Sequence, residues 1–496
     1  MLVGSVQRRD RSVALWIFLA MLALYVAMGR GHFLGTDEIG VYQQARSLWE
    51  RGDLAVGEIN NTFPGRDGRW YSQYGVAQSL LALPLYAAGT LAERVLPGPF
   101  RAALAGPSIG GEPSRWGGDV PIFFVSLFGA FVSAALCAVF YGLSRRLGAA
   151  PRGAALAALL LGTTTHVFAQ ATTFLQHPLE ALLLLGAFGL LMEDAREASR
   201  RRRACAGVLL GLALNARVAA WVALPALLGY AAVVAYRRSR RDLGRAAAEI
   251  LPMLLALVPF VLVWGVVGWW KFGAFPPRFN NEGFSSPLLL GLSGYLLSPG
   301  LAVWIYSPLL LLAAWPLGSW WRRSRLEVLC VLAIALSYLL CFSKYTAWHG
   351  LWSAFGPRYL LAVVPLLLLP LGVWLGEARR SALLAVVPLA LAGLLMQVMG
   401  AAVNFAYVYH AWRWPEFRPE YGFLFVPEIS PPVAFWKSLW SGQHIDLWLF
   451  NAWRDAGPGY ALALGLPLLL LVVLSLWRVR WLAWGTPRPD QAILPR

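Results

Sequence analysis

The chain has 496 residues, of which 58% are hydrophobic and only 14% are charged. Apolar runs of about 20 residues recur from one end to the other, which excludes a soluble globular protein. The formal net charge of +17 comes from short basic clusters between these runs and not from one basic face, so the pattern argues against nucleic acid as a partner.

Twelve apolar segments predict an all-α polytopic membrane protein with about twelve transmembrane helices. The segment 204–235, counted as two, could instead form one helix that is interrupted at Asn215-Ala-Arg217. The first segment could be the apolar region of a signal peptide, but no cleavage site follows it, and we predict an uncleaved helix. The segments are 13–29, 120–142, 153–169, 178–192, 204–214, 219–235, 250–270, 302–319, 326–342, 359–375, 381–400 and 459–477.

Lysine and arginine are dense in the loops on the side of the amino terminus, and the positive-inside rule places that side in the cytoplasm. Both termini are then cytoplasmic, and we expect one domain over 1–477 followed by a tail at 478–496. Two long loops face the outside, 30–119 and the aromatic segment 401–458. Within the first, 75–95 suits an interfacial helix better than a span; if it crossed the bilayer, every later helix would reverse its orientation.

Polar and charged residues at the predicted helix ends concentrate on the outer side. Such groups are costly at the edge of the hydrocarbon unless they face a cavity or one another, so we predict that they form one functional site. These residues are Asp37, Glu38, Gln176, His177, Glu180, Asn215, Arg217, Lys344, His349 and Arg358.

Asp37 and Glu38 are adjacent carboxylates just beyond the first apolar segment. They could be a solvated pair, or Thr36 and Asp37 could cap the following helix. Partial desolvation at the membrane surface could equally shift the pKa of one of these carboxylates so that it acts as a base. His177 and Glu180 share a helix face and could bind a divalent metal together with Asp37, but one histidine among carboxylates is a weak signal. We therefore assign no metal and no cofactor.

Basic residues supply the opposite charge. Arg217 lies on a tight turn between two apolar segments, although it could simply reach the outer interface. Lys344, His349 and Arg358 surround a turn in which Trp348 offers a stacking face; each could anchor a lipid headgroup, but together they favour binding of an anion. A carboxylate opposite fixed cations suits attack of a hydroxyl on a lipid-linked phosphate sugar, because the carboxylate accepts the proton and the cations stabilise the departing phosphate.

Five motifs, in this order along the chain, resemble a family of membrane enzymes. They read "TDEIGVYQQARSLWERGDLAV", "GRDGRWYSQYGVAQSLLALPLYAAG", "GLALNARVAAWVALPALL", "LLSPGLAVWIYSPLLLL" and "WHGLWSAFGPRYLLAVVP". From Asp37 to about Leu371 the chain resembles the polytopic GT-C glycosyltransferases, specifically the protein-O-mannosyltransferase and aminoarabinose-transferase-like branch (glycosyltransferase family 39-like). Two positions depart from the pattern: Gln73 replaces a frequent lysine, and Leu301 follows Gly300 where relatives often have a cation.

The resemblance implies inverting transfer of a sugar from a polyprenyl phosphate donor, in bacteria usually undecaprenyl or decaprenyl phosphate. The acceptor would be a hydroxyl of a lipid, glycan or protein on the outer face of the plasma membrane. Asp37 would be the base, with Glu38 supporting it or orienting the acceptor. The residues expected to bind phosphate are Arg217, Lys344 and Arg358, and the remaining substrate contacts are His177, His349, Tyr74 and Trp348.

Two other classes of protein remain as alternatives. A secondary transporter or lipid-carrier flippase predicts broken helices near the bilayer midplane and two related halves, and we see no internal repeat. A non-catalytic scaffold of the cell envelope predicts that the acidic pair is dispensable.

Overall fold

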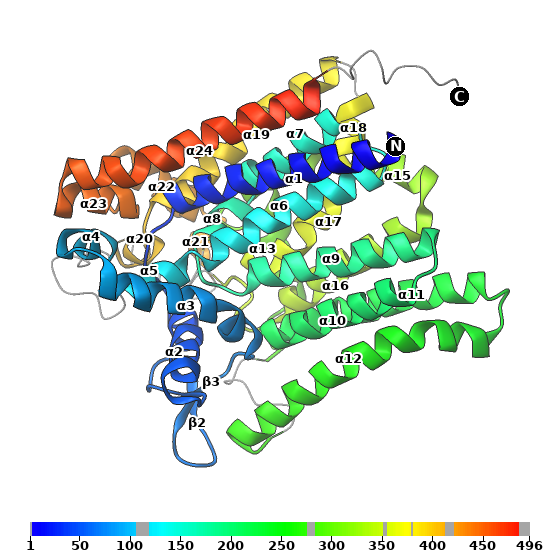
Figure 1. Ribbon diagram of the computed structural model, residues 1–496, viewed down its shortest axis with the longest axis horizontal. Coiled ribbons are helices and arrows are strands. Elements are labelled where there is room, and N and C mark those ends of the chain that lie inside the picture. Colours follow the sequence, from blue (N-terminus) through cyan, green and yellow to red (C-terminus); the bar gives the residue numbers. More distant parts are fainter. Residues whose placement is uncertain are drawn as a thin grey trace.

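The structure, a computed structural model, describes residues 2–105, 119–274, 283–350, 355–377, 380–411 and 421–485. Its long helices lie side by side in one bundle, as Figure 1 shows. Seven helical segments of the described chain are long and apolar enough to cross a membrane: Gln7–Ala27, Val120–Arg146, Val218–Arg238, Leu243–Phe272, Arg325–Lys344, Leu384–Ala402 and Pro458–Trp484. The prediction of a helical polytopic membrane protein is therefore confirmed.

These seven segments coincide with seven of the predicted spans. They are formed by α1 (Leu2–Ala27), α5 (Val120–Ser126) with α6 (Phe128–Arg146), η1 (Val218–Val222) with α11 (Leu224–Arg238), α12 (Leu243–Phe272), α16 (Arg325–Lys344), α19 (Arg380–Ala402) and α24 (Pro458–Trp484). Three further predicted spans fall on α7 (Pro151–Thr164), α9 (His177–Arg196) and α10 (Arg200–Ala216), with the short α8 (Val167–Ala171) between the first two. The total of twelve spans stays a prediction.

The two remaining predicted spans, 302–319 and 359–375, are broken helices. The first follows α13 (Leu288–Leu296) and consists of α14 (Val303–Tyr306), η2 (Pro308–Leu312) and α15 (Ala314–Arg323). The second consists of η4 (Arg358–Val363), α17 (Val364–Leu368) and α18 (Leu371–Glu377), and it bends by 42° before α18. Pro308 and Pro370 lie at the breaks, where a residue without a backbone N–H interrupts the helix. The side chain of Gln397 compensates by donating to Tyr306 O at 2.7 Å.

Glycines bring α7 into direct backbone contact with two later helices. A Cβ atom at Gly153 would lie 2.3 Å from the carbonyl oxygen of Gly372 in α18. One at Gly393 in α19 would lie 2.3 Å from the carbonyl oxygen of Thr164. Close approach of this kind is a general way to pack helices where lipid leaves no hydrophobic driving force between them.

The loop 30–119, predicted to face the outside and called the first outer loop below, contains a small sheet that the all-helical prediction did not include. Its elements are α2 (Thr36–Arg51), β1 (Ala55–Val56), β2 (Thr62–Pro64), β3 (Trp70–Ser72), α3 (Ala77–Val95) and α4 (Gly98–Leu104). The strand order is β1-β3-β2, both pairs are antiparallel, and Tyr71 pairs with Ala55 on one side and Phe63 on the other. The helix expected at 75–95 is present as α3, and its place at the interface stays a prediction.

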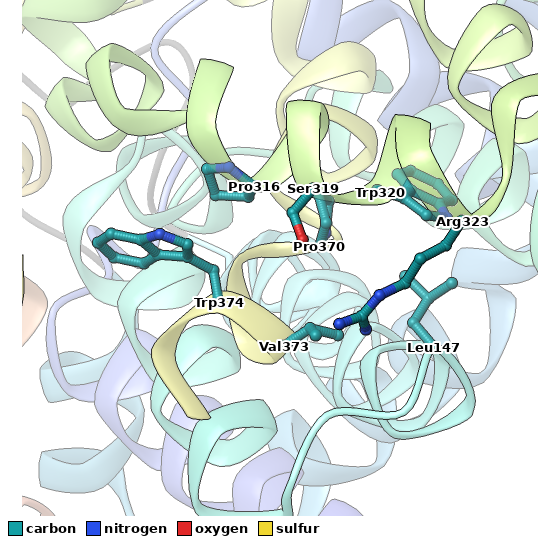
Figure 2. Close-up of a pocket in the computed structure, with 8 residues that line it drawn as sticks. All are labelled: Leu147, Pro316, Ser319, Trp320, Arg323, Pro370, Val373 and Trp374. Atoms are coloured by element: carbon teal, nitrogen blue, oxygen red, sulfur yellow. The ribbon is translucent and has the colours of Figure 1, made fainter. Parts of the chain in front are cut away.

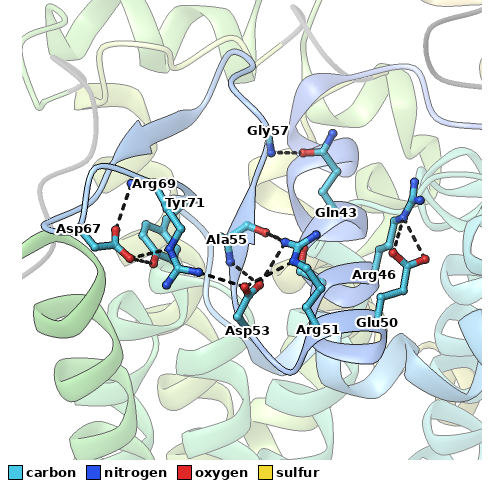
Figure 3. A network of polar contacts seen from close by, with 11 residues as sticks. Gln43, Arg46, Glu50, Arg51, Asp53, Ala55, Gly57, Asp67, Arg69 and Tyr71 are labelled. Carbon is cyan, nitrogen blue, oxygen red and sulfur yellow. Dashed lines mark hydrogen bonds and ion pairs between the residues drawn. The ribbon is translucent and has the colours of Figure 1, made fainter.

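Charged side chains hold this sheet against α2, as Figure 3 shows. Arg51 in the last turn of α2 pairs with Asp53 at 3.1 Å. Arg69 pairs with the same carboxylate at 3.1 Å and with Asp67 at 2.7 Å. Although each exposed pair alone contributes little, the shared carboxylate joins the end of α2 to the turn between β2 and β3.

The described residues of the segment 401–458, which the sequence predicts to lie outside, form short helices. They are α20 (Phe405–Ala411), α21 (Gly422–Phe425), η6 (Pro427–Ile429), α22 (Pro431–Trp440) and α23 (Trp448–Ala456). Buried polar contacts join this segment to the residues after α1: His32 Nε2 lies 2.9 Å from Asp446 Oδ1, and Trp448 N donates to Gly29 O at 3.0 Å. The segment therefore closes over one end of the bundle.

The beginning of α1 and the end of α24 lie at the opposite end of the bundle (Figure 1). Arg9 Nε donates to Leu482 O at 2.7 Å, and Arg9 Nη2 donates to Gly485 O at 2.9 Å. The start of α1 and the end of α24 thus lie on one side of the bundle, as the sequence predicts, while the assignment of that side to the cytoplasm stays a prediction.

A small cavity of about 20 Å³ lies among α15, α18 and the end of α6 (Figure 2). A space of this size holds about one water molecule and no sugar. It is lined by Leu147, Pro316, Ser319, Trp320, Arg323, Pro370, Val373 and Trp374, none of which belongs to the predicted site.

Candidate functional site

Glu38 fixes the start of α2. Its Oε2 accepts hydrogen bonds from the backbone of Leu34 at 2.8 Å and Gly35 at 3.0 Å, and its Oε1 accepts one from Phe174 N at 2.6 Å. The side chain is buried, and burial raises the pKa of Glu38, whereas the three backbone hydrogen bonds lower it in part. With both oxygens bound to backbone amides, Glu38 anchors the first turn of α2 to the segment before α9.

Asp37 projects from the same turn toward three polar side chains. Asn61 Nδ2 donates to its Oδ1 at 2.5 Å, and Arg358 Nη1 lies 3.5 Å from its Oδ2. Tyr74 also hydrogen bonds to Asp37; burial, together with this carboxylate, raises the pKa of Tyr74 well above its usual value. Tyr74 is therefore a neutral donor, so an amide and a phenol hydrogen bond to the Asp37 carboxylate, and a guanidinium lies beside it.

Arg358 is the first residue of η4 and is only 6% exposed. Its guanidinium lies over the ring of Tyr359 at 5.1 Å. Its Nε and Nη1 atoms make no hydrogen bond with any described residue. A buried guanidinium with unused donors is an arrangement that suits an anionic ligand, because guanidinium groups bind phosphate through paired N–H donors.

Arg217 lies at the break between α10 and η1, as the sequence predicts. Its Nη1 donates to Glu180 Oε2 at 2.5 Å, and Tyr338 donates to Glu180 Oε1 at 2.6 Å. The guanidinium also lies 5.2 Å from the ring centroid of Tyr359. Because Nη1 of Arg217 is hydrogen-bonded to Glu180, whereas Nε and Nη1 of Arg358 have no hydrogen bond with a described residue, Arg358 is the stronger candidate for direct contact with an anion.

The ring of Tyr359 thus borders both arginines and also His177. The His177 ring lies 5.8 Å from it, and neither ring nitrogen bonds to a described residue, although the side chain is only 3% exposed. Buried polar atoms normally have partners, so these nitrogens are available to a ligand. The structure therefore brings Asp37, Arg358, Arg217 and His177 into one cluster.

Trp348 and His349 lie on a turn that borders this cluster. The Tyr295 hydroxyl donates to Trp348 O, and His349 packs against the ring of Tyr421 at 4.9 Å. The next residue, Gly350, has φ +62°, and a Cβ there would lie 3.1 Å from Arg358 Nε. Only glycine fits this approach, which brings the turn onto the guanidinium.

Three predicted residues lie apart from these contacts. The Lys344 side chain is exposed at the end of α16 and forms no ion pair with a described residue. Asn215 donates to Phe260 O at 2.8 Å and so joins α10 to α12. Gln176 lies just before α9, and its Nε2 has no partner among the described residues. Across the described chain, no group of three or more His, Cys, Asp and Glu residues is arranged to hold a metal.

The sequence analysis missed two residues of the cluster. Asn61 lies in a polar loop 24 residues after Asp37, and nothing in the spacing joins the two. Tyr359 directly follows Arg358 in the printed sequence, and an aromatic residue beside a basic one was the available signal.

No family model matches the chain, and no curated protein matches it. Among solved structures it is similar to ArnT from Cupriavidus metallidurans bound to undecaprenyl phosphate, with 16% identity and a TM-score of 0.48, over 98% of this chain and 78% of that one. It is also similar to the oligosaccharyltransferase of Archaeoglobus fulgidus in the apo form, with 11% identity and a TM-score of 0.46, over 86% of this chain and 63% of that one.

A third similar structure is AglB from Archaeoglobus fulgidus in complex with an inhibitory peptide and a dolichol-phosphate, with 11% identity and a TM-score of 0.46, over 84% of this chain and 60% of that one. The chain therefore spans less than two thirds of either oligosaccharyltransferase. These similarities concern the arrangement of the helices, and we take no residue role from them.

Proposed function

We propose that the protein is a membrane glycosyltransferase that moves a sugar from a polyprenyl phosphate donor to an acceptor hydroxyl. The observation that supports this best is the pairing of Asp37 with Arg358, a carboxylate with hydrogen-bond donors around it beside a buried guanidinium with unused N–H groups. The motif resemblance points to the same chemistry, and a bilayer would hold the lipid tail of the donor.

In the proposed reaction Asp37 accepts the proton of the acceptor hydroxyl as its oxygen attacks the anomeric carbon. The bond between that carbon and the phosphate oxygen breaks, and the configuration inverts. Arg358 and, more distantly, Arg217 stabilise the negative charge of the departing phosphate. The exposed Lys344, at the end of α16, is a further phosphate contact in this proposal. Glu38 positions Asp37 through the first turn of α2, and His177, His349, Tyr74 and Trp348 surround the substrate.

The donor and the role of Asp37 can be tested with purified protein in lipid nanodiscs. A panel of polyprenyl phosphate sugars identifies the donor that is consumed, and Asp37→Asn should then lower kcat at least about 100-fold, the usual contribution of a general base. Asp455→Asn is the matched control, because it removes an exposed outer carboxylate that pairs with Arg454 at 2.7 Å.

Full transfer by Asp37→Asn would overturn the mechanism. Movement of a fluorescent polyprenyl phosphate across proteoliposomes, unaffected by Asp37→Asn and without consumption of any donor, would favour the flippase alternative. That alternative is worth the measurement because two helices of the bundle are broken, as a transporter would require.

A further inference from the structure

A second cavity lies in the first outer loop, and none of its described lining residues belongs to the seven apolar segments. Its volume is about 530 Å³, and its walls are residues 58–63 and Trp70. Cavities that bind small molecules or sugar units have volumes of about 300–1,000 Å³, so this one is large enough for a ligand.

Asn61 connects this cavity to Asp37. It lines the cavity, and its Nδ2 donates to Asp37 Oδ1 at 2.5 Å. Its backbone has φ +68°, a left-handed conformation that asparagine adopts more readily than most residues. The same residue therefore forms one wall of the cavity and orients the carboxylate.

The lining of the cavity distinguishes between classes of ligand. None of the described residues that line it is a lysine or an arginine, and Glu58 adds an exposed carboxylate, so the cavity does not suit a phosphate or another anion. The exposed Asn60 offers an amide donor and an amide acceptor for hydroxyl groups. Trp70 offers a flat apolar ring, against which the C–H side of a sugar ring can pack.

The frame of the cavity is held by one hydrogen bond from α2 and one within the lining segment itself. Gln43 Oε1 in α2 accepts a hydrogen bond from Gly57 N at 2.9 Å, directly before the lining segment (Figure 3). Thr62 closes the other end of the segment, since its hydroxyl accepts from Ile59 N at 2.9 Å. A site that binds a ligand needs such support, because ordering a loop on binding costs free energy.

We propose that this cavity is the acceptor subsite and that it takes a neutral sugar unit of a glycan whose hydroxyl reaches Asp37. The proposal rests on the transferase function proposed above. The acceptor would then approach from the first outer loop, while the donor phosphate lies at Arg358. Asn61 is the positioning residue between them.

The test measures binding of both ligands by the full-length protein in nanodiscs. An array presents neutral oligosaccharides, sialylated and phosphorylated oligosaccharides, and peptides rich in serine and threonine; undecaprenyl phosphate binding is followed in parallel by native mass spectrometry. We expect binding of neutral oligosaccharides that Trp70→Ala weakens about tenfold, the loss of one aromatic contact of about 1.4 kcal/mol. Asn60→Ala, outside the strands, repeats the test in case Trp70→Ala disturbs the sheet.

Trp440→Ala is the matched control, because Trp440 is 82% exposed on α22 in the other outer segment. Binding of peptides in preference to neutral glycans, equal glycan binding by the wild type and both cavity variants, or no glycan binding at all would each overturn the acceptor proposal. Failure of the wild type to bind undecaprenyl phosphate would instead count against the proposed function, and the cavity variants should leave that binding unchanged.

Discussion

At the scale of single residues, the side-chain amide of the loop residue Asn61 orients the carboxylate of Asp37. Asn61→Gly keeps the left-handed backbone at φ +68° without strain and removes only the amide that donates to Asp37. A lost hydrogen bond to a charged group corresponds to about 1.5–3 kcal/mol, so we expect kcat to fall at least about tenfold. The KM for the donor should stay unchanged in steady-state kinetics, and an unaltered kcat would contradict this role.

Arg217 and Glu180 form a buried ion pair, and removal of one charge leaves the other without compensation. Glu180 is 1% exposed, so Arg217→Gln leaves a buried carboxylate with Tyr338 as its remaining hydrogen-bond donor. Breaking one half of such a pair costs about 3–5 kcal/mol, and we expect a clear fall in the thermal unfolding temperature.

The double variant Arg217→Gln/Glu180→Gln removes both charges and should recover most of that stability. If its unfolding temperature equals that of Arg217→Gln, the pair does not contribute in this way. Donor binding should remain weakened in both variants, which separates the role of the arginine in stability from its role toward phosphate.

At the scale of elements, one buried lysine joins the outer loop to the end of α12. Lys271 Nζ donates to Gln44 Oε1 at 2.7 Å and to the carbonyl oxygens of Ser72 at 3.2 Å and Tyr74 at 3.4 Å. Lys271→Met leaves these acceptors without their donor, at about 1–3 kcal/mol for each buried group. Faster amide hydrogen exchange over residues 62–75 is the expected result, and Arg245→Met, at the exposed start of α12, is the control that should not change it.

The long helices could be predicted because an apolar run of about 20 residues is a local property of the sequence. The breaks in 302–319 and 359–375 were not predicted, because a proline such as Pro308 or Pro370 does not by itself predict a break: α12 stays one helix through Pro252 and Pro259. Their interruption depends on partners such as Gln397, which compensates a carbonyl that only the packed structure brings near it. The sheet was missed because strands of two or three residues are too short to show alternation.

The site was predictable to the extent that topology alone brings residues together. Asp37 and Arg358 were expected on the same face of the membrane, and in the structure Arg358 Nη1 lies 3.5 Å from Asp37 Oδ2. Glu180, in contrast, was expected as one of several outer polar groups, and its pairing with Arg217 depends on the relative rotation of α9 and α10. Rotation of a helix about its axis is set by packing that the sequence pattern of an all-apolar helix does not reveal.

At the scale of the whole molecule, the pair of His32 and Asp446 joins the outer segment 401–458 to the end of α1. Burial alone would lower the pKa of His32, but the attraction of Asp446 prevails and raises it above the usual 6.5. Burial alone would raise the pKa of Asp446, but His32 and Arg30 prevail and lower it below the usual 3.8.

The stabilisation from His32 is complete below pH 6.5 and is lost as the pH rises through its raised pKa. That from Asp446 is complete above pH 3.8 and is lost as the pH falls through its lowered pKa. We therefore expect this pair to raise the unfolding temperature most between these two values. His32→Asn should flatten that part of the pH profile, and an unchanged profile in the variant would contradict the assignment.

The ring of Tyr359, with Arg217 at 5.2 Å and Arg358 at 5.1 Å from its centroid, has a spectroscopic consequence. The magnetic shielding of a fluorine atom on that ring depends on the electric field of the two guanidinium groups. An anion that binds to either group changes this field, whether or not a bond is made or broken. A fluorotyrosine at this position would therefore report the occupancy of the proposed phosphate site by nuclear magnetic resonance, independently of turnover.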